Sequence, residues 1–466
     1  MEIITNIENN YEFEDIVKLF APNNYNELDF KLEHSFTENE KSVENDYVIV
    51  LSGKNYTHHK STTKPSIISS KNLAKIGLYE ILSKIFNKTL PYGALTGIRP
   101  VKLCYDLMTK GIKKYELKKF LTNNYYVSNE KAELIIETLI NQGELDLNDK
   151  LINFYVNIPF CPTRCSYCSF ISIDKSSTTE EIIDEYVDKL VYEINETKKF
   201  LFENFYIVKN VYIGGGTPTC LNEKQLEKIL QALCFNVKEF TVEAGRPDTI
   251  TKEKLDLLEK YKVSRISINP QTLNDKVLEK IGRHHTAKDV LTAYDLARNY
   301  NFDINMDLIM GLPNDTLKGF KETLDAVIYL SPENITIHTL SLKRTSNLSN
   351  ENANIFKNES IVNKMSIYSY NQLKLNNYMP YYLYRQKNMI NSLENLGYSK
   401  ENKQCNFNIE TMDDLASVVA CGANAISKRV FSLSNRIERA PNVKDIKEYN
   451  SRVDEMIKRK KDLFKN

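Results

Sequence analysis

The sequence has no excess of either charge, no long apolar run and no basic leader at its start. Lysine and arginine number 62 against 61 aspartate and glutamate, so bulk electrostatics does not attract the chain to nucleic acid or to a membrane surface. No run approaches the about 18 apolar residues that a membrane span needs. Residues 1–8 have neither the basic nor the apolar region of a signal peptide. We therefore expect a cytoplasmic protein that binds no nucleic acid.

Cysteine is too sparse for a disulfide framework, because only eight occur in 466 residues. Reduced cysteines that cluster in sequence usually bind metal, and three of the eight form a C-x3-C-x2-C run within residues 160–168, directly after a short apolar segment. A structural zinc site normally takes four protein ligands, as does an iron–sulfur cube that only carries electrons. Three thiolates on a four-iron cluster leave one iron open to a second molecule. We therefore predict Cys161, Cys165 and Cys168 as cluster ligands. The other cysteines include Cys104, Cys234 and Cys421, which we expect in the core.

Strand-like and helix-like segments alternate from residue 151 onward, which predicts an α/β fold with a parallel sheet wrapped by helices. We expect a partial (β/α)6 barrel over 151–345, preceded by an α+β domain over 1–150 and followed by an α/β extension over 346–466. A charged amphipathic helix in the tail, 444–466, is expected to be a solvated cap. The predicted strands are 154–158, 208–213, 239–243, 264–268, 303–309 and 335–340.

Polar or glycine residues follow these strands, where a barrel of this kind binds ligands. The second strand ends in a Gly-Gly-Gly-Thr-Pro turn over 214–218, whose glycines let the backbone approach a ligand closely. Glu243 ends the third strand as an acceptor suited to ribose hydroxyls. The fourth strand runs into Gln271, Arg283 follows twelve residues later, and the fifth strand carries Asp307. Singly each is more often an ordinary surface group, but together they predict a site.

These motifs resemble the radical S-adenosylmethionine (SAM) superfamily, in which a C-x3-C-x2-C loop follows the first strand and a GGGTP turn the second. Later motifs resemble the oxygen-independent coproporphyrinogen III oxidase group, and within it the HemZ-type coproporphyrinogen dehydrogenases. They are Tyr92-Gly-x-Leu-Thr-Gly-x-Arg-Pro, Glu243-Ala-Gly-Arg-Pro, Asn269-Pro-Gln, Arg283-His-His-Thr, Pro380-Tyr-Tyr-Leu-Tyr-Arg-Gln-Lys-Asn388 and Asn395-Leu-Gly-Tyr398.

The resemblance implies a radical SAM barrel that holds a [4Fe–4S] cluster on the three cysteines and binds one or two SAM molecules, with the aromatic Tyr167 beside the last cysteine. Positions that match the lining of the first SAM are Tyr155, Gly215, Glu243 and Ile426. Positions that match the surroundings of a second SAM are Gly216, Thr217, Gln271, Arg283, Asp307 and Leu340.

The activity that the resemblance implies is the oxidative decarboxylation of coproporphyrinogen III to protoporphyrinogen IX in haem biosynthesis. A 5′-deoxyadenosyl radical would take a hydrogen from the β-carbon of a propionate, and loss of carbon dioxide and one electron would leave a vinyl group. No catalytic side chain is needed beyond the cluster and SAM, but a low-potential electron donor is. Arg99, Arg385 and Lys387 are candidate contacts for the substrate carboxylates.

The alternative is a HemW-type haem chaperone, which shares the cluster and fold and binds haem without decarboxylating anything. The chain departs from the oxidase pattern at Phe170, where that pattern carries a further cysteine, and at Asn157, where the broader group often has histidine. The long segment before the first strand favours the HemZ-type interpretation, because HemW-type chaperones usually start near their first strand. A zinc-stabilised binding module is disfavoured by the three-ligand count and the glycine turn.

Overall fold

The computed structural model describes residues 1–7, 11–21, 28–97, 99–146, 148–168, 172–341, 359–385, 393–431 and 436–465. The chain divides into two compact units, Met1–Leu139 and Ile140–Asn466. The threefold division with breaks near 150 and 345 stays a prediction.

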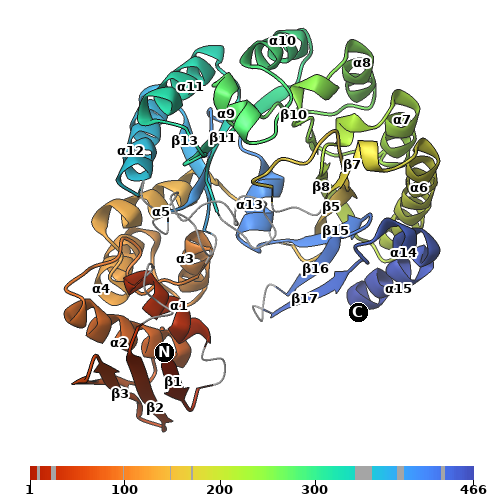
Figure 1. Ribbon diagram of the computed structural model, residues 1–466. Coiled ribbons are helices and arrows are strands. Elements are labelled where there is room, and N and C mark those ends of the chain that lie inside the picture. Colours follow the sequence, from red (N-terminus) through yellow and green to blue (C-terminus); the bar gives the residue numbers. More distant parts are fainter. Residues whose placement is uncertain are drawn as a thin grey trace. The chain divides into compact units, whose positions relative to one another are not determined.

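The first unit carries a four-stranded sheet in the order β1-β2-β3-β4 and a set of helices (Figure 1). Helix α2 packs on this sheet, because Tyr47 donates a hydrogen bond to the Ala74 carbonyl at 2.6 Å and its ring lies against Gly77. The elements are β1 Glu2–Thr5, α1 Tyr11–Phe20, β2 Phe30–Glu38, β3 Ser42–Leu51, β4 Lys54–Thr63, α2 Ser70–Ile85, α3 Pro100–Thr109, α4 Leu117–Tyr125 and α5 Asn129–Asn141.

The second unit is built on an 11-stranded sheet in the order β13-β14-β12-β11-β10-β9-β8-β5-β15-β16-β17. Six parallel neighbours correspond to the six predicted strands: β5 Leu151–Ile158, β8 Ile207–Gly215, β9 Glu239–Val242, β10 Arg265–Ser267, β11 Asp303–Met310 and β12 Asn334–Thr339. The α/β prediction is confirmed. A further parallel strand that was not predicted, β15 (Ser417–Cys421), lies beside β5.

Antiparallel strands complete the sheet on both edges. They are β13 Met379–Tyr384, β14 Asn395–Ser399, β16 Ile426–Phe431 and β17 Arg436–Pro441. Two short strands, β6 Phe160–Cys161 and β7 Ile173–Asp174, pair separately after β5. Among the described residues, no helix is both long and apolar enough to cross a membrane.

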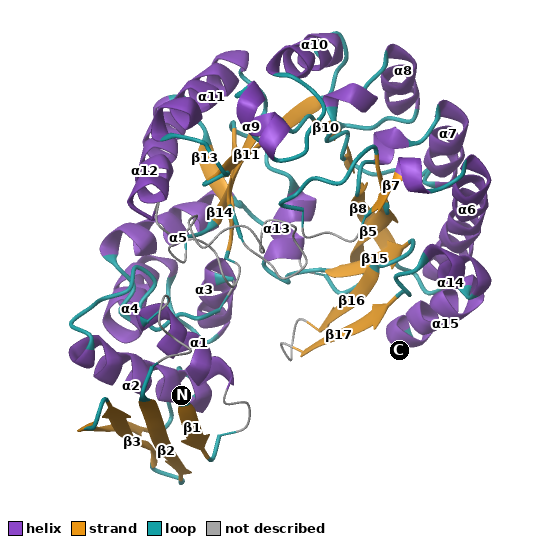
Figure 2. Cartoon of the chain, in the orientation of Figure 1, coloured by secondary structure: helices purple, strands orange, loops and turns teal. Residues whose placement is uncertain are grey.

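Helices that follow the parallel strands lie on the outer side of the curved sheet, and α13 lies on its inner side (Figure 2). Polar caps set where several begin: the Thr251, Thr286 and Thr316 side chains each accept a backbone N–H of the first turn. The helices are α6 Glu180–Glu203, α7 Glu223–Ala232, α8 Lys252–Lys260, α9 Asp275–Lys280, α10 Ala287–Ala297, α11 Leu317–Leu330, α12 Glu359–Leu375, α13 Asn406–Met412, α14 Ile446–Ser451 and α15 Val453–Phe464.

The parallel strands alternate between apolar and polar side chains. In β5, Phe154 and Val156 are fully buried toward the helices, while Asn153, Tyr155 and Asn157 project from the other face. Asn153 on that face donates to the Glu410 carboxylate of α13 at 2.8 Å. The inner face of the barrel is therefore polar along its depth, and α13 fills part of it.

Candidate functional site

The cysteine loop begins where β6 ends and lies at the carboxyl-terminal rim of the sheet. Cys161, Cys165 and Cys168 are half-buried, and none of them is in a disulfide. Cys168 N–H donates to the Cys165 carbonyl at 3.1 Å, and the Thr217 hydroxyl donates to the Cys161 sulfur at 3.7 Å. The sulfur of the first cysteine is thus brought to the glycine turn of the second strand.

Contacts from later strand ends hold this loop. Ser166 N–H donates to the Ile281 carbonyl at 3.0 Å. Arg246, which follows β9, donates a hydrogen bond to the Thr163 hydroxyl at 3.0 Å. It also donates two hydrogen bonds, of 2.9 and 2.8 Å, to the Asp248 carboxylate. A forked guanidinium–carboxylate pair fixes the arginine in orientation. The loop is therefore anchored to the segments that follow β9 and β10.

The donor set of the loop suits an iron–sulfur cluster, because such clusters are held by cysteine thiolates and three cysteines occur within eight residues. Among the described residues, no group of three or more His, Cys, Asp or Glu side chains is close enough to hold a metal ion. Burial raises the pKa of Cys161, and hydrogen bonds from Ser172 and Thr217 oppose that rise. Since the thiolate is the metal ligand, those hydrogen bonds favour the ligand form.

The glycine turn has no room for side chains. A Cβ on Gly215, whose φ is +104°, would lie 2.3 Å from Asn157 Oδ1. A Cβ on Gly216 would lie 2.3 Å from the Phe160 carbonyl oxygen and 3.0 Å from the Cys161 sulfur. The absence of side chains here lets the turn pack against the cysteine loop. The predicted contact of its backbone with a ligand stays a prediction.

Glu243 lies at the mouth of the barrel as a hydrogen-bonded carboxyl. Burial raises its pKa to about 7, against the opposing hydrogen bond that Tyr212 donates to Oε1 at 2.6 Å. The rings of Tyr155 and Phe407 stack with Tyr212, at centroid distances of 6.2 and 4.5 Å. These aromatic rings line one side of the Glu243 carboxyl group, which can accept hydrogen bonds from hydroxyl groups of a ligand.

Gln271 follows β10, Arg283 follows α9, and Asp307 lies within β11. Gln271 has a φ of +66°, rare for a side-chain-bearing residue, and its N–H donates to the Asp307 carbonyl at 2.9 Å. Arg283 donates to the Asn269 carbonyl at 2.6 Å and to the Tyr167 hydroxyl at 3.0 Å.

Two buried polar atoms, Gln271 Oε1 and Arg283 Nε, have no hydrogen-bond partner among the described residues. Such atoms are costly unless a ligand satisfies them. Burial raises the pKa of Asp307, but hydrogen bonds from His338 and Asn305 outweigh it and hold that pKa below its usual value. The buried polar atoms and the ionised carboxylate fit a polar, zwitterionic ligand such as SAM.

The other predicted residues are spread over the sheet. Leu340 is buried directly after β12, and its N–H donates to the Met310 carbonyl at 3.0 Å. Ile426, at the start of β16, is 51% exposed. Arg385 is buried directly after β13. Arg99 belongs to the other compact unit, where it precedes α3.

Two positions from the sequence analysis, Lys387 and Phe170, lie outside the described residues. The expectation that Cys234 is a core residue is wrong, because it follows α7 and is exposed. Cys104 and Cys421 are buried, as expected.

Several residues at this rim escaped the sequence analysis. Tyr212 lies two residues before the glycine turn, and the alternating polar pattern of the strand would have placed it on the inner face. Arg246 belongs to the Glu243-Ala-Gly-Arg-Pro motif, which does not by itself predict its hydrogen bond to Thr163 in the cysteine loop. Phe407 of α13 and the turn 422–425 after β15 carry no local signal, because only the fold brings them to the barrel.

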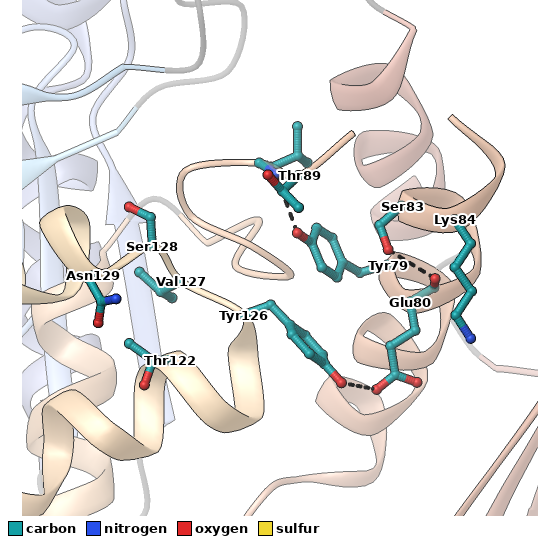
Figure 3. A pocket seen from close by; sticks show the side chains of 11 residues that line it. Tyr79, Glu80, Ser83, Lys84, Thr89, Thr122, Tyr126, Val127, Ser128 and Asn129 are labelled. Carbon is teal, nitrogen blue, oxygen red and sulfur yellow. Dashed lines mark hydrogen bonds between the residues drawn. The ribbon is translucent and has the colours of Figure 1, made fainter. Parts of the chain in front are cut away.

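A separate pocket of about 560 Å³ lies in the first unit (Figure 3). None of the predicted site residues lines it. Its carboxylate, Glu80, is already paired with Lys60, His58 and the Tyr126 hydroxyl. The pocket is therefore distinct from the chemistry of the cysteine loop.

Comparison with known proteins agrees with this geometry. The profile of the Radical SAM superfamily matches residues 155–327. The oxygen-independent coproporphyrinogen-III oxidase-like protein HemZ of Bacillus subtilis is 35% identical over 419 residues, which cover 86% of this chain and 83% of that one. The heme chaperone HemW of the same organism is 38% identical over 194 residues, covering 40% and 49%.

Among solved structures, the coproporphyrinogen III oxidase HemN of Escherichia coli is similar with a TM-score of 0.51 and 21% identity, covering 70% of this chain and 73% of that one. That likeness supports the partial barrel. The chain belongs to the radical SAM superfamily and, within it, to the group of oxygen-independent coproporphyrinogen III oxidase-like proteins of the HemZ type. Its cofactors are accordingly a [4Fe–4S] cluster and SAM.

Proposed function

We propose that the chain is an oxygen-independent coproporphyrinogen III dehydrogenase of porphyrin biosynthesis. The observation that carries this is the extent of the similarity to the HemZ protein. It takes in 86% of the chain, more than the barrel alone, whereas the similarity to the Bacillus HemW takes in 40%. The segment before the barrel is thus shared with an oxidase-like protein. A cytoplasmic location belongs to the same proposal, and the eight free thiols support it.

The residues of the rim have distinct parts in this proposal. Cys161, Cys165 and Cys168 hold the cluster, and the glycine turn lets SAM approach it. Glu243 accepts hydrogen bonds from hydroxyl groups of the first SAM, and Tyr155 lies beside it. Gln271, with its unpartnered amide oxygen, and Asp307, with its lowered pKa, offer acceptors to a second SAM. Other contacts in the proposal are Tyr167, Gly215, Gly216, Thr217, Arg283, Leu340 and Ile426.

When bound, the cluster and SAM supply one-electron chemistry that takes a hydrogen atom from an unreactive carbon. Each propionate that reacts then loses a hydrogen atom, carbon dioxide and one electron to become a vinyl group. The reaction needs a low-potential electron donor and a one-electron acceptor. The protein moves no proton in this scheme, so it needs no paired acid and base. Arg385, buried after β13, is proposed to contact a carboxylate of the substrate, together with Arg99 and Lys387.

The test is anaerobic incubation of the reduced, cluster-loaded protein with SAM and coproporphyrinogen III. The expected result is a tetrapyrrole that carries vinyl groups, detected by mass as the loss of carbon dioxide and two hydrogens per propionate. A Cys165→Ala variant is the control and is expected to give no product. Without vinyl product from the cluster-loaded protein, the proposal is wrong.

The second candidate is a haem chaperone, favoured by the 38% identity to HemW. Stoichiometric binding of haem by the same preparation, without decarboxylation, would support it. Both functions use the same cluster, so the product assay distinguishes them.

A further inference from the structure

A buried ion pair lies behind the turn that follows β15. Glu193 of α6 pairs with Lys460 of α15, and both side chains are buried. Glu193 also accepts hydrogen bonds from the Tyr449 hydroxyl at 2.6 Å and the Asn442 amide at 2.8 Å. The tail is thus not only a solvated cap, because one face of it packs against α6, beside which it lies in Figure 1. An ion pair taken out of water persists only when further hydrogen bonds satisfy it.

This pair holds the backbone at the end of β15. Gly422 N–H donates to Glu193 Oε2 at 2.7 Å, and Lys460 donates to the Ala420 carbonyl at 3.1 Å. The Asn442 amide, already bonded to Glu193, also donates to the Gly422 carbonyl at 2.8 Å. Gly422 has a φ of +103°, and a Cβ there would lie 2.4 Å from the Asn157 carbonyl oxygen. The turn 422–425 is therefore clamped against the end of β5.

Asn157 connects this turn to the predicted SAM residues. Its amide nitrogen donates to the Ala423 carbonyl at 2.7 Å. Its amide oxygen accepts the Tyr155 hydroxyl at 3.0 Å and lies 2.3 Å from the Cβ position of Gly215. The Tyr186 hydroxyl joins the same elements, because it donates to the Asn157 carbonyl at 2.7 Å and accepts from Ala423 N–H at 3.2 Å.

We propose that Lys460, acting through Glu193, is a positioning residue for SAM. The charged pair orients the turn 422–425, and the turn orients Asn157, which sets the Tyr155 hydroxyl and the backbone of Gly215. Charge-assisted hydrogen bonds are shorter and stronger than neutral ones, which suits them to hold a turn in one geometry. This inference rests on the proposed placement of SAM at the Tyr155–Gly215 edge and does not depend on the tetrapyrrole substrate.

The test compares Lys460→Met with Lys461→Met in the full-length, cluster-loaded protein. Lys461 is a matched control, because it pairs with Glu196 on the same two helices at 3.3 Å but is only partly buried. We expect Lys460→Met to retain its iron and to raise the Kd for SAM at least fivefold, measured by anaerobic calorimetry. The change that SAM causes in the electron paramagnetic resonance spectrum of the reduced cluster should weaken in parallel. Lys461→Met should stay within twofold of wild type.

A folded Lys460→Met protein with wild-type SAM affinity overturns the proposal, as does equal weakening in both variants. If Lys460→Met does not fold, the double variant Glu193→Gln with Lys460→Met removes both charges together. It is expected to raise the Kd at least threefold, and wild-type affinity would again overturn the proposal. A wild-type protein that binds SAM but does not decarboxylate coproporphyrinogen III contradicts the proposed function alone.

Discussion

Individual side chains at the rim are held by partners far away in sequence. Arg246 and Thr163 are 83 residues apart, and Arg283 and Tyr167 are 116 apart. These contacts tie the cysteine loop to the third and fourth parallel strands. The position of the loop therefore depends on residues from several later segments of the chain.

Replacing a single loop cysteine should abolish the cluster. We expect about four irons per chain in the reconstituted wild type and less than about one in Cys165→Ala, measured by iron and sulfide analysis. Cys234→Ala is the control, because that thiol is exposed and distant in sequence from the loop. If Cys165→Ala retained full iron, the ligand assignment would be incorrect.

The Glu243 carboxyl should make stability fall with rising pH in protein without cofactors. Burial raises its pKa to about 7 in the folded chain, above the ordinary value of 4.5. The folded state therefore binds this proton more tightly than the unfolded state does. Its contribution to the free energy of unfolding is fully present below pH 4.5 and is lost as the pH rises to about 7, at up to about 1.4 kcal/mol per pH unit. Denaturant unfolding of wild type and Glu243→Gln across this range measures the effect. Identical pH profiles for the two proteins would contradict it.

At the scale of elements, two turns at strand ends are packed too closely to admit a side chain at their glycines. Both the glycine turn after β8 and the turn after β15 press on β5, from opposite sides in the sheet order. Strand β5 thereby carries the geometry of the cysteine loop, of Tyr155 and of Asn157 at once.

Gly216→Ala should disrupt the cysteine loop, whereas Gly245→Ala should be tolerated. The added carbon at Gly216 would meet the Phe160 carbonyl oxygen at 2.3 Å, while at Gly245 the nearest atom is 3.5 Å away. We expect destabilisation of roughly 1–3 kcal/mol and reduced iron content for Gly216→Ala. Thermal unfolding and iron analysis of both variants provide the check. Equal behaviour of the two would show that the turn is not tightly packed.

At the scale of the whole molecule, the two compact units contain different parts of the predicted site. All three cysteines and the SAM positions belong to Ile140–Asn466, while Met1–Leu139 contributes the substrate candidate Arg99. Its own core rests on α2 packed over the ring of Tyr47.

Gly77→Ala should therefore weaken the first unit and leave the cluster intact. The added carbon would lie 2.4 Å from the Tyr47 hydroxyl and 2.7 Å from its ring, which predicts a loss of about 1–3 kcal/mol. Hydrogen exchange of the first unit should rise while iron content and SAM affinity stay at wild-type values. Loss of iron in this variant would show that the second unit does not hold its cofactors alone.

The sequence by itself determined the order of six parallel strands and the helices between them, the cysteine loop, the glycine turn and the polar residues near the strand ends. These depend on short-range spacing: thiols within eight residues, and side chains that alternate along a strand. Tertiary structure alone decided the rest. The Tyr212–Glu243 hydrogen bond, Phe407 inside the barrel and the Glu193–Lys460 pair join residues up to 267 positions apart. No local pattern marks such pairs, because their stability comes from burial that exists only once the sheet has closed around them.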